Sequence, residues 1–69
     1  MYYVKSTNAW NQDTVYAFTT KAYAEKFLNT EQADFRDREI VDRKEAAEIV
    51  GGNHQLDLFV DTCADEFVK

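Results

Sequence analysis

The chain has 69 residues, of which 45% are hydrophobic and 30% charged, and these values predict one small folded domain over residues 1–69 rather than a disordered segment. Eight lysine and arginine residues against thirteen aspartate and glutamate residues give a net charge of −5, which disfavours direct binding to nucleic acid phosphates. A single cysteine excludes an intramolecular disulfide, and one cysteine with one histidine cannot form a zinc cluster. With neither a signal-peptide pattern nor an apolar run of membrane length, we expect a soluble protein of the cytoplasm.

Two runs rich in β-branched and aromatic residues predict an amino-terminal β-hairpin. They are YYVKST at 2–7 and TVYAFT at 14–19. Alternation in the second run puts Tyr16 and Phe18 on one face of the strand, with Val15 and Ala17 on the other.

Trp10 is the one apolar aromatic residue of the polar loop predicted at 8–13. An exposed tryptophan there would anchor a protein interface, because it buries a large area at a small entropic cost. Alternatively, Trp10 folds back over the hairpin and covers a thin core. Both interpretations stay open, and Trp10 is a candidate partner-binding residue.

A short amphipathic helix is predicted over 19–30. Thr19 or Thr20 can accept a hydrogen bond from an unpaired backbone N–H of the first turn. Apolar residues at helical spacing then form one stripe, which consists of Tyr23, Ala24, Phe27 and Leu28. We expect this stripe to pack on the hairpin.

The segment 35–41 is ambiguous and could add a third strand beside the hairpin, and the segment after it predicts a second helix. Ile40 and Val41 favour a strand over 35–41, and the charges around them make it an edge strand at best. Asp42 stands three residues ahead of Glu45, which is the spacing of a capping box, so a helix is predicted over 43–50.

The glycine pair at 51 and 52 is interpreted as a joint between two helices. Gly51 occupies the position where a helix end needs a positive φ, and Asn53 can cap a following helix. A helix over 54–67 gathers more apolar residues on one stripe than a strand does. No phosphate-binding glycine pattern surrounds the pair.

Four acids near the carboxyl terminus are further candidates for partner binding. On a continuous helix, Asp57, Asp61 and Asp65 are four residues apart and line up away from the core, with Glu66 beside them. Such a row can stand in for phosphates before a basic surface. The alternative is an ordinary solvated face, and a straight helix cannot wrap these carboxylates around one metal ion.

No feature of the sequence predicts catalysis, a metal or a cofactor. His54 follows an exposed turn and is tied to no nucleophile, while Cys63 falls on the apolar stripe as a buried small residue. We therefore expect a protein that is not an enzyme. The basic residues are concentrated locally only between positions 36 and 44, at Arg36, Arg38, Arg43 and Lys44. Acidic residues lie among them, which disfavours a nucleic-acid site in this segment.

The predicted fold is α+β, with a hairpin, a helix, a third antiparallel strand if 35–41 pairs beside the hairpin, and two short helices on one face of the sheet. This layout, with FTTKAYAEKFLN after the hairpin and DRKEAAEIVGG later, resembles small accessory proteins of bacteriophages and mobile elements, anti-CRISPR proteins among them. The resemblance implies an inhibitor that binds a host defence or nucleic-acid-handling protein in the host cytosol. It assigns no residue a role, and the eight basic residues depart from a strong DNA mimic. The alternative is a structural subunit that self-associates through exposed aromatic strands.

Overall fold

A computed structural model of the protein describes residues 1–30, 35–60 and 64–68, the side chains of Phe35, Arg36 and Phe59 excepted. Its elements are β1 (Tyr2–Asn8), β2 (Asp13–Phe18), α1 (Lys21–Leu28), β3 (Phe35–Val41), α2 (Arg43–Val50), α3 (Asn53–Phe59) and the 3₁₀ helix η1 (Ala64–Phe67). The predicted α+β class is confirmed. Among the described residues, no helix has the length and apolar character needed to cross a membrane.

The three strands form one antiparallel sheet in the order β2-β1-β3. The predicted hairpin is confirmed, with Tyr3 of β1 opposite Ala17 of β2. The third strand is confirmed too, because Tyr3 also faces Val41 of β3 across the other side of β1. β1 is therefore the central strand, and β2 and β3 are the edges.

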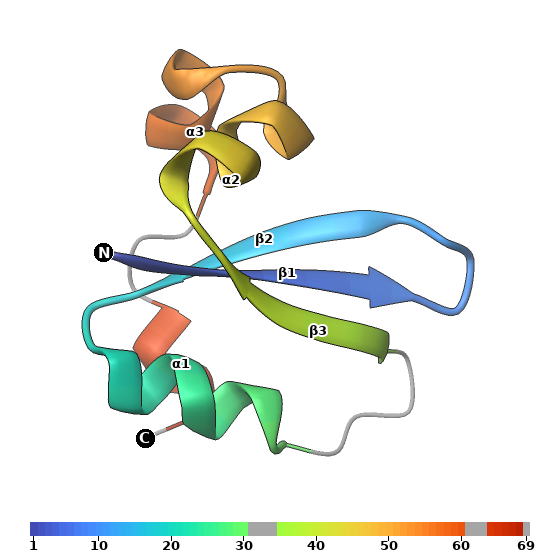
Figure 1. The fold of residues 1–69 in the computed structure, drawn as a ribbon, viewed down its shortest axis with the longest axis vertical. Coiled ribbons are helices and arrows are strands. Elements are labelled where there is room, and N and C mark those ends of the chain that lie inside the picture. The colour runs from blue at the N-terminus through green and yellow to red at the C-terminus, as the bar shows by residue number, and fades with distance from the viewer. Residues whose placement is uncertain (31–34, 61–63, 69) are drawn as a thin grey trace.

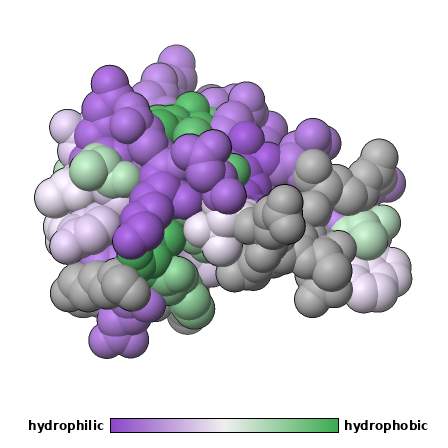
Figure 2. Space-filling view, turned by 90° about the horizontal axis from the view of Figure 1, so that it is seen from below, coloured by the Kyte–Doolittle hydropathy of each residue, from purple (hydrophilic) through white to green (hydrophobic). Residues whose placement is uncertain are grey.

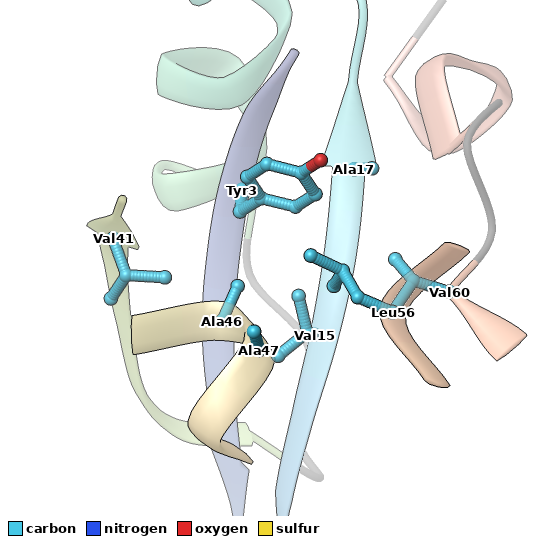
Figure 3. Packing of buried hydrophobic residues seen from close by; sticks show 8 residues of the cluster. All are labelled: Tyr3, Val15, Ala17, Val41, Ala46, Ala47, Leu56 and Val60. Carbon is cyan, nitrogen blue, oxygen red and sulfur yellow. The ribbon is translucent and has the colours of Figure 1, made fainter. Parts of the chain in front are cut away.

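Each face of the sheet carries its own helical layer (Figure 1). On the α2/α3 face, side chains of the strands and of the two helices point toward one another (Figure 3); this cluster contains Tyr3, Val15, Ala17, Val41, Ala46, Ala47, Leu56 and Val60. On the α1/η1 face, the second cluster contains Val4, Phe18, Ala24, Phe27, Ala64 and Val68. The predicted alternation of β2 is confirmed, since neighbouring residues of this strand belong to opposite faces.

Local capping accounts for where α1 and α2 begin and where α2 ends. The side-chain oxygen of Thr20 accepts a hydrogen bond from the backbone N–H of Tyr23 at 3.2 Å. Asp42 does the same for the N–H of Glu45 at 2.8 Å. At the end of α2, Gly51 has φ of 103°, a left-handed conformation that glycine adopts without a steric penalty. These caps were predicted from the sequence.

The prediction of one helix over 54–67 is wrong. α3 starts at Asn53, which is therefore not its N-cap, and Val60 after it is extended, with φ of −83° and ψ of 129°. Val60 packs in the cluster of the α2/α3 face, whereas Ala64 packs in the cluster of the opposite face. A straight helix cannot reach both faces of a sheet, so the apolar residues of this segment are divided between the two layers.

Candidate functional site

Trp10 lies in the β1–β2 turn with 72% of its surface exposed, the highest value among the exposed large hydrophobic residues of the described chain. It does not fold back over the core. Of the two interpretations left open by the sequence, the structure supports the exposed one.

Hydrogen bonds brace the backbone around Trp10. The side-chain carbonyl oxygen of Asn8 accepts bonds from the backbone N–H of Trp10 at 2.8 Å and of Gln12 at 3.0 Å. The N–H of Asn11 donates to the carbonyl oxygen of Asn8 at 3.1 Å, and Asn11 has a positive φ of 61°, which asparagine tolerates better than most residues. The turn therefore presents Trp10 from an ordered backbone.

The acidic row predicted on the last helix does not exist as one surface, because Asp65 is buried. Only 7% of Asp65 is exposed. One carboxylate oxygen accepts a bond from the backbone N–H of Thr19 at 3.0 Å, and the other accepts from the Thr19 hydroxyl. Asp65 thus ties η1 to the β2–α1 junction, and the prediction that Asp65 lies on an exposed face, as a partner-binding residue would, is wrong.

Asp57 has an exposed side chain, and its charge is paired. Arg43 of α2 donates to its Oδ1 at 2.7 Å and to the hydroxyl of Tyr3 at 2.9 Å. The hydrogen bond from this guanidinium to Asp57 and the charge of Asp57 raise the pKa of Arg43 above its ordinary value. Glu66 is exposed, and Asp61 lies outside the described residues.

The described basic residues of 36–44 do not gather on one surface. Arg38 belongs to β3, and its guanidinium lies over the ring of Phe27 at 4.9 Å and donates to the backbone oxygen of Phe27 at 2.7 Å. Arg43 starts α2, on the other face of the sheet. Lys44 is exposed, and the side chain of Arg36 lies outside the described residues.

A second charged surface, on the open half of the α2/α3 face, was not singled out from the sequence. Lys5 and Glu39 form an ion pair at 2.8 Å, and a shallow hollow there is lined by Lys5, Thr7, Asp37, Arg38 and Glu39. Glu39 raises the pKa of Lys5 through its hydrogen bond and charge, and the charge of Asp13 adds to the effect. The available signal was the acid at alternate positions of FRDREIV, which places both acids on one strand face.

The described residues assemble no metal site. His54 is exposed, and Cys63 lies outside the description. Across residues 1–30, 35–60 and 64–68, no three His, Cys, Asp or Glu side chains are grouped so as to hold a metal ion. The groove beside the start of α3 is open and is lined by Arg43, Lys44, Ala47, Glu48, Gly52 and Asn53.

Comparison of the chain with protein-family models, with curated proteins and with solved structures gave no match.

Proposed function

We propose that this protein is a non-enzymatic binding protein that inhibits one protein partner and docks on it through Trp10. The observation that carries the proposal is a tryptophan with 72% of its surface exposed on a hydrogen-bonded turn. Such a side chain contributes little to the core of its own chain. In an interface, it removes about 150–250 Å² of its surface from water, and interface hot spots are enriched in tryptophan.

The neighbours of Trp10 along the turn are small or polar (Asn8, Ala9, Asn11 and Gln12), which favours a small anchor over a broad apolar contact. Seen from the α1/η1 side, the coloured surface is largely hydrophilic, and its apolar residues form separate areas (Figure 2). A localised anchor within a polar surface is the arrangement expected of a partner that binds reversibly.

We further propose that the partner is a host defence or nucleic-acid-handling protein. The support for this identity is electrostatic. A net charge of −5 attracts a basic surface and speeds association with it at low salt. Glu66 can contribute to this attraction directly, whereas the Asp57 carboxylate contributes less because Arg43 holds it in an ion pair.

The test is an affinity pull-down from a bacterial lysate with the tagged protein, identified by mass spectrometry and repeated at low and high salt. The captured partner is then titrated with the wild type and with Trp10→Ala. Loss of an interface hot spot predicts binding weaker by about 30-fold or more. Leu58→Ala is the matched control, because Leu58 on α3 is also exposed, at 59%, and lies away from the turn.

Circular dichroism and a thermal unfolding curve must show that Trp10→Ala keeps the wild-type fold. Unchanged affinity of this folded variant for the partner would refute the anchor role. Capture of only the protein itself, with a molecular mass that rises with concentration, would refute inhibition of a partner and support the structural-subunit alternative.

A further inference from the structure

The outer edge of β3 has no strand beside it in the part of the chain that the structure describes, because β3 pairs only with β1. Hydrogen bonds of an antiparallel ladder alternate along each strand. The N–H of Asn8 donates to the oxygen of Gln12, so even-numbered residues of β1 bond toward β2 and odd-numbered ones toward β3. In the register of β1 and β3, Glu39 therefore faces β1, and the backbone N–H and C=O of Ile40 point to the outer edge.

The side chains along this edge determine which types of residue an added strand must carry. On the α2/α3 face, Asp37 and Glu39 are exposed and follow each other at alternate positions. Lys5 and Arg38 also line the hollow beside them, but the Arg38 guanidinium lies over Phe27 on the opposite face of the sheet. Asp13 adds a further acid on the α2/α3 face. The excess of carboxylates favours basic residues at alternate positions of the added strand, where cross-strand pairs of opposite charge are stabilising.

The opposite face of the same edge is apolar near its end. Ile40 is 38% exposed and Tyr2 is 40% exposed. They lie diagonally on one face, since Ile40 is opposite Val4 and Tyr2 precedes Val4 by two positions. An apolar residue of an added strand would cover this exposed surface.

Three registers in which two β3 strands from two copies could pair are disfavoured by the same charges. An antiparallel pair about a two-fold axis places Asp37 opposite Glu39 when the axis passes through Arg38, and opposite itself when the axis passes through Asp37. Moving the axis to Glu39 sets that residue against its own copy. Each of these registers brings like charges together, a common protection of an exposed edge strand.

We propose that the outer edge of β3 binds an extended segment of the protein partner as a fourth strand. The segment carries lysine or arginine at alternate positions, against Asp37 and Glu39, and an apolar residue beside Ile40. This inference rests on the proposed function, because it gives the chemistry of the partner that the protein binds. The backbone of Ile40 supplies hydrogen bonds to the segment, and the carboxylates supply selectivity.

The probe is a nine-residue peptide with lysine at odd positions and valine or threonine at even positions. Titration into the isotope-labelled protein is expected to shift the amide signals of β3 and to be weakened by salt. Two peptides serve as controls, one with glutamate in place of lysine and one with the same residues in an order that clusters the lysines. Equal binding of the clustered peptide would overturn the proposal in favour of nonspecific attraction.

Two variants test the charge and the backbone separately. Asp37→Lys with Glu39→Lys is expected to weaken binding of the lysine peptide about tenfold and to make the glutamate peptide the better ligand. Its matched control is Glu25→Lys with Glu48→Lys, which changes the net charge equally on helices α1 and α2. If both double variants lose the same affinity, the site is not at β3.

The backbone variant is Ile40→Pro, compared with Ile40→Ala. Proline removes the outward N–H and leaves the bonds of Glu39 to β1, so it should abolish peptide binding while Ile40→Ala retains most of it. Were Ile40→Pro to unfold, the swap of peptide preference in the charge variant still decides the proposal. A peptide that binds wild type and both charge variants alike refutes it.

The experiments distinguish a wrong proposal for the β3 edge from a wrong proposal for docking through Trp10. If the captured partner depends on Trp10 and is unaffected by the β3 variants, only the edge proposal is wrong. If the lysine peptide binds β3 and no captured protein depends on Trp10, the proposed docking function is wrong and the edge remains a binding surface.

Discussion

Asp65 is a structural residue although its sequence context suggests an exposed acid. Its carboxylate is buried and accepts two hydrogen bonds from Thr19, which lies 46 positions earlier. Asp65→Ala leaves the N–H and hydroxyl of Thr19 without this acceptor. We expect a loss of about 1–3 kcal/mol in the free energy of unfolding, measured by urea denaturation. Asp65→Asn keeps the shape and one acceptor oxygen and should lose less.

The control for Asp65 is its neighbour Glu66, which is exposed. Glu66→Gln should leave the urea midpoint unchanged within error. A midpoint that moves as much for Glu66→Gln as for Asp65→Ala would mean that general charge repulsion, and not the Thr19 contact, sets the effect.

The ion pair of Lys5 and Glu39 makes stability depend on pH at the alkaline end. The pKa of Lys5 is raised in the folded chain, first by the hydrogen bond to Glu39 and then by its charge. A raised pKa means that the folded state binds the proton more tightly than the unfolded state. The contribution is therefore complete below the ordinary lysine pKa and disappears as the pH rises through the folded value.

A double-mutant cycle of Lys5→Met and Glu39→Gln isolates the coupling of this pair from the other ionisable groups of the chain. The coupling should be favourable at neutral pH and vanish once the pH has risen through the raised pKa of Lys5, in a chain that stays folded. It should also shrink at high salt, because the pair lies at the surface. A coupling that is constant with pH would contradict the assignment.

At the scale of the elements, the joint between α2 and α3 depends on two glycines with different constraints. Gly51 has φ of 103° and Gly52 has φ of 130° with ψ of 166°. A side chain at Gly51 would come no closer than 3.7 Å to Gln55, and at Gly52 it would meet nothing within 4 Å. Backbone strain, and not a steric clash with neighbours, therefore determines the effect of substitution.

Gly51→Ala is expected to destabilise the protein by about 1–2 kcal/mol. Gly52→Ala should be worse, at about 2–3 kcal/mol, because its φ and ψ lie in a region that glycine alone occupies. The two variants are compared by thermal unfolding at one pH. Equal melting temperatures for Gly52→Ala and wild type would indicate that the joint can adopt another backbone path.

The elements that could be predicted from the sequence are those fixed by local chemistry. The hairpin follows from alternation, the start of α2 from Asp42, and its end from Gly51. The break after Phe59 has no such local signal, since neither proline nor glycine stands there. It arises because Val60 and Ala64 pack on opposite faces of the sheet, a division that periodicity along one segment cannot reveal.

The residues of the candidate site also differ in how far the sequence could predict their positions. Exposure of Trp10 was one of two predicted alternatives, because a polar loop permits both an outward and an inward tryptophan. The acidic row depended entirely on a continuous helix, and burial of Asp65 removed it. The acids of β3 were visible in the sequence, but their proximity to Lys5 requires the pairing of β1 with β3.

At the scale of the whole molecule, the two helical layers share one sheet and should unfold together. Tyr3 and Val4 are consecutive residues of β1, and their side chains belong to opposite clusters. If either helical layer unfolds, it exposes side chains of β1, and β1 also supports the other layer. The total stability of a chain of this size is roughly 3–10 kcal/mol, so loss of one cluster is enough to unfold the molecule.

Leu56→Ala in the α2/α3 cluster and Phe27→Ala in the α1/η1 cluster test this coupling. Both side chains are 1% exposed, and truncation is expected to destabilise the protein by about 2–5 kcal/mol. Amide signals on both faces should then report the same unfolding midpoint in each variant. If Leu56→Ala instead lowers the midpoint only for α2 and α3 while α1 stays protected, the two layers unfold independently, and the shared strand does not couple them.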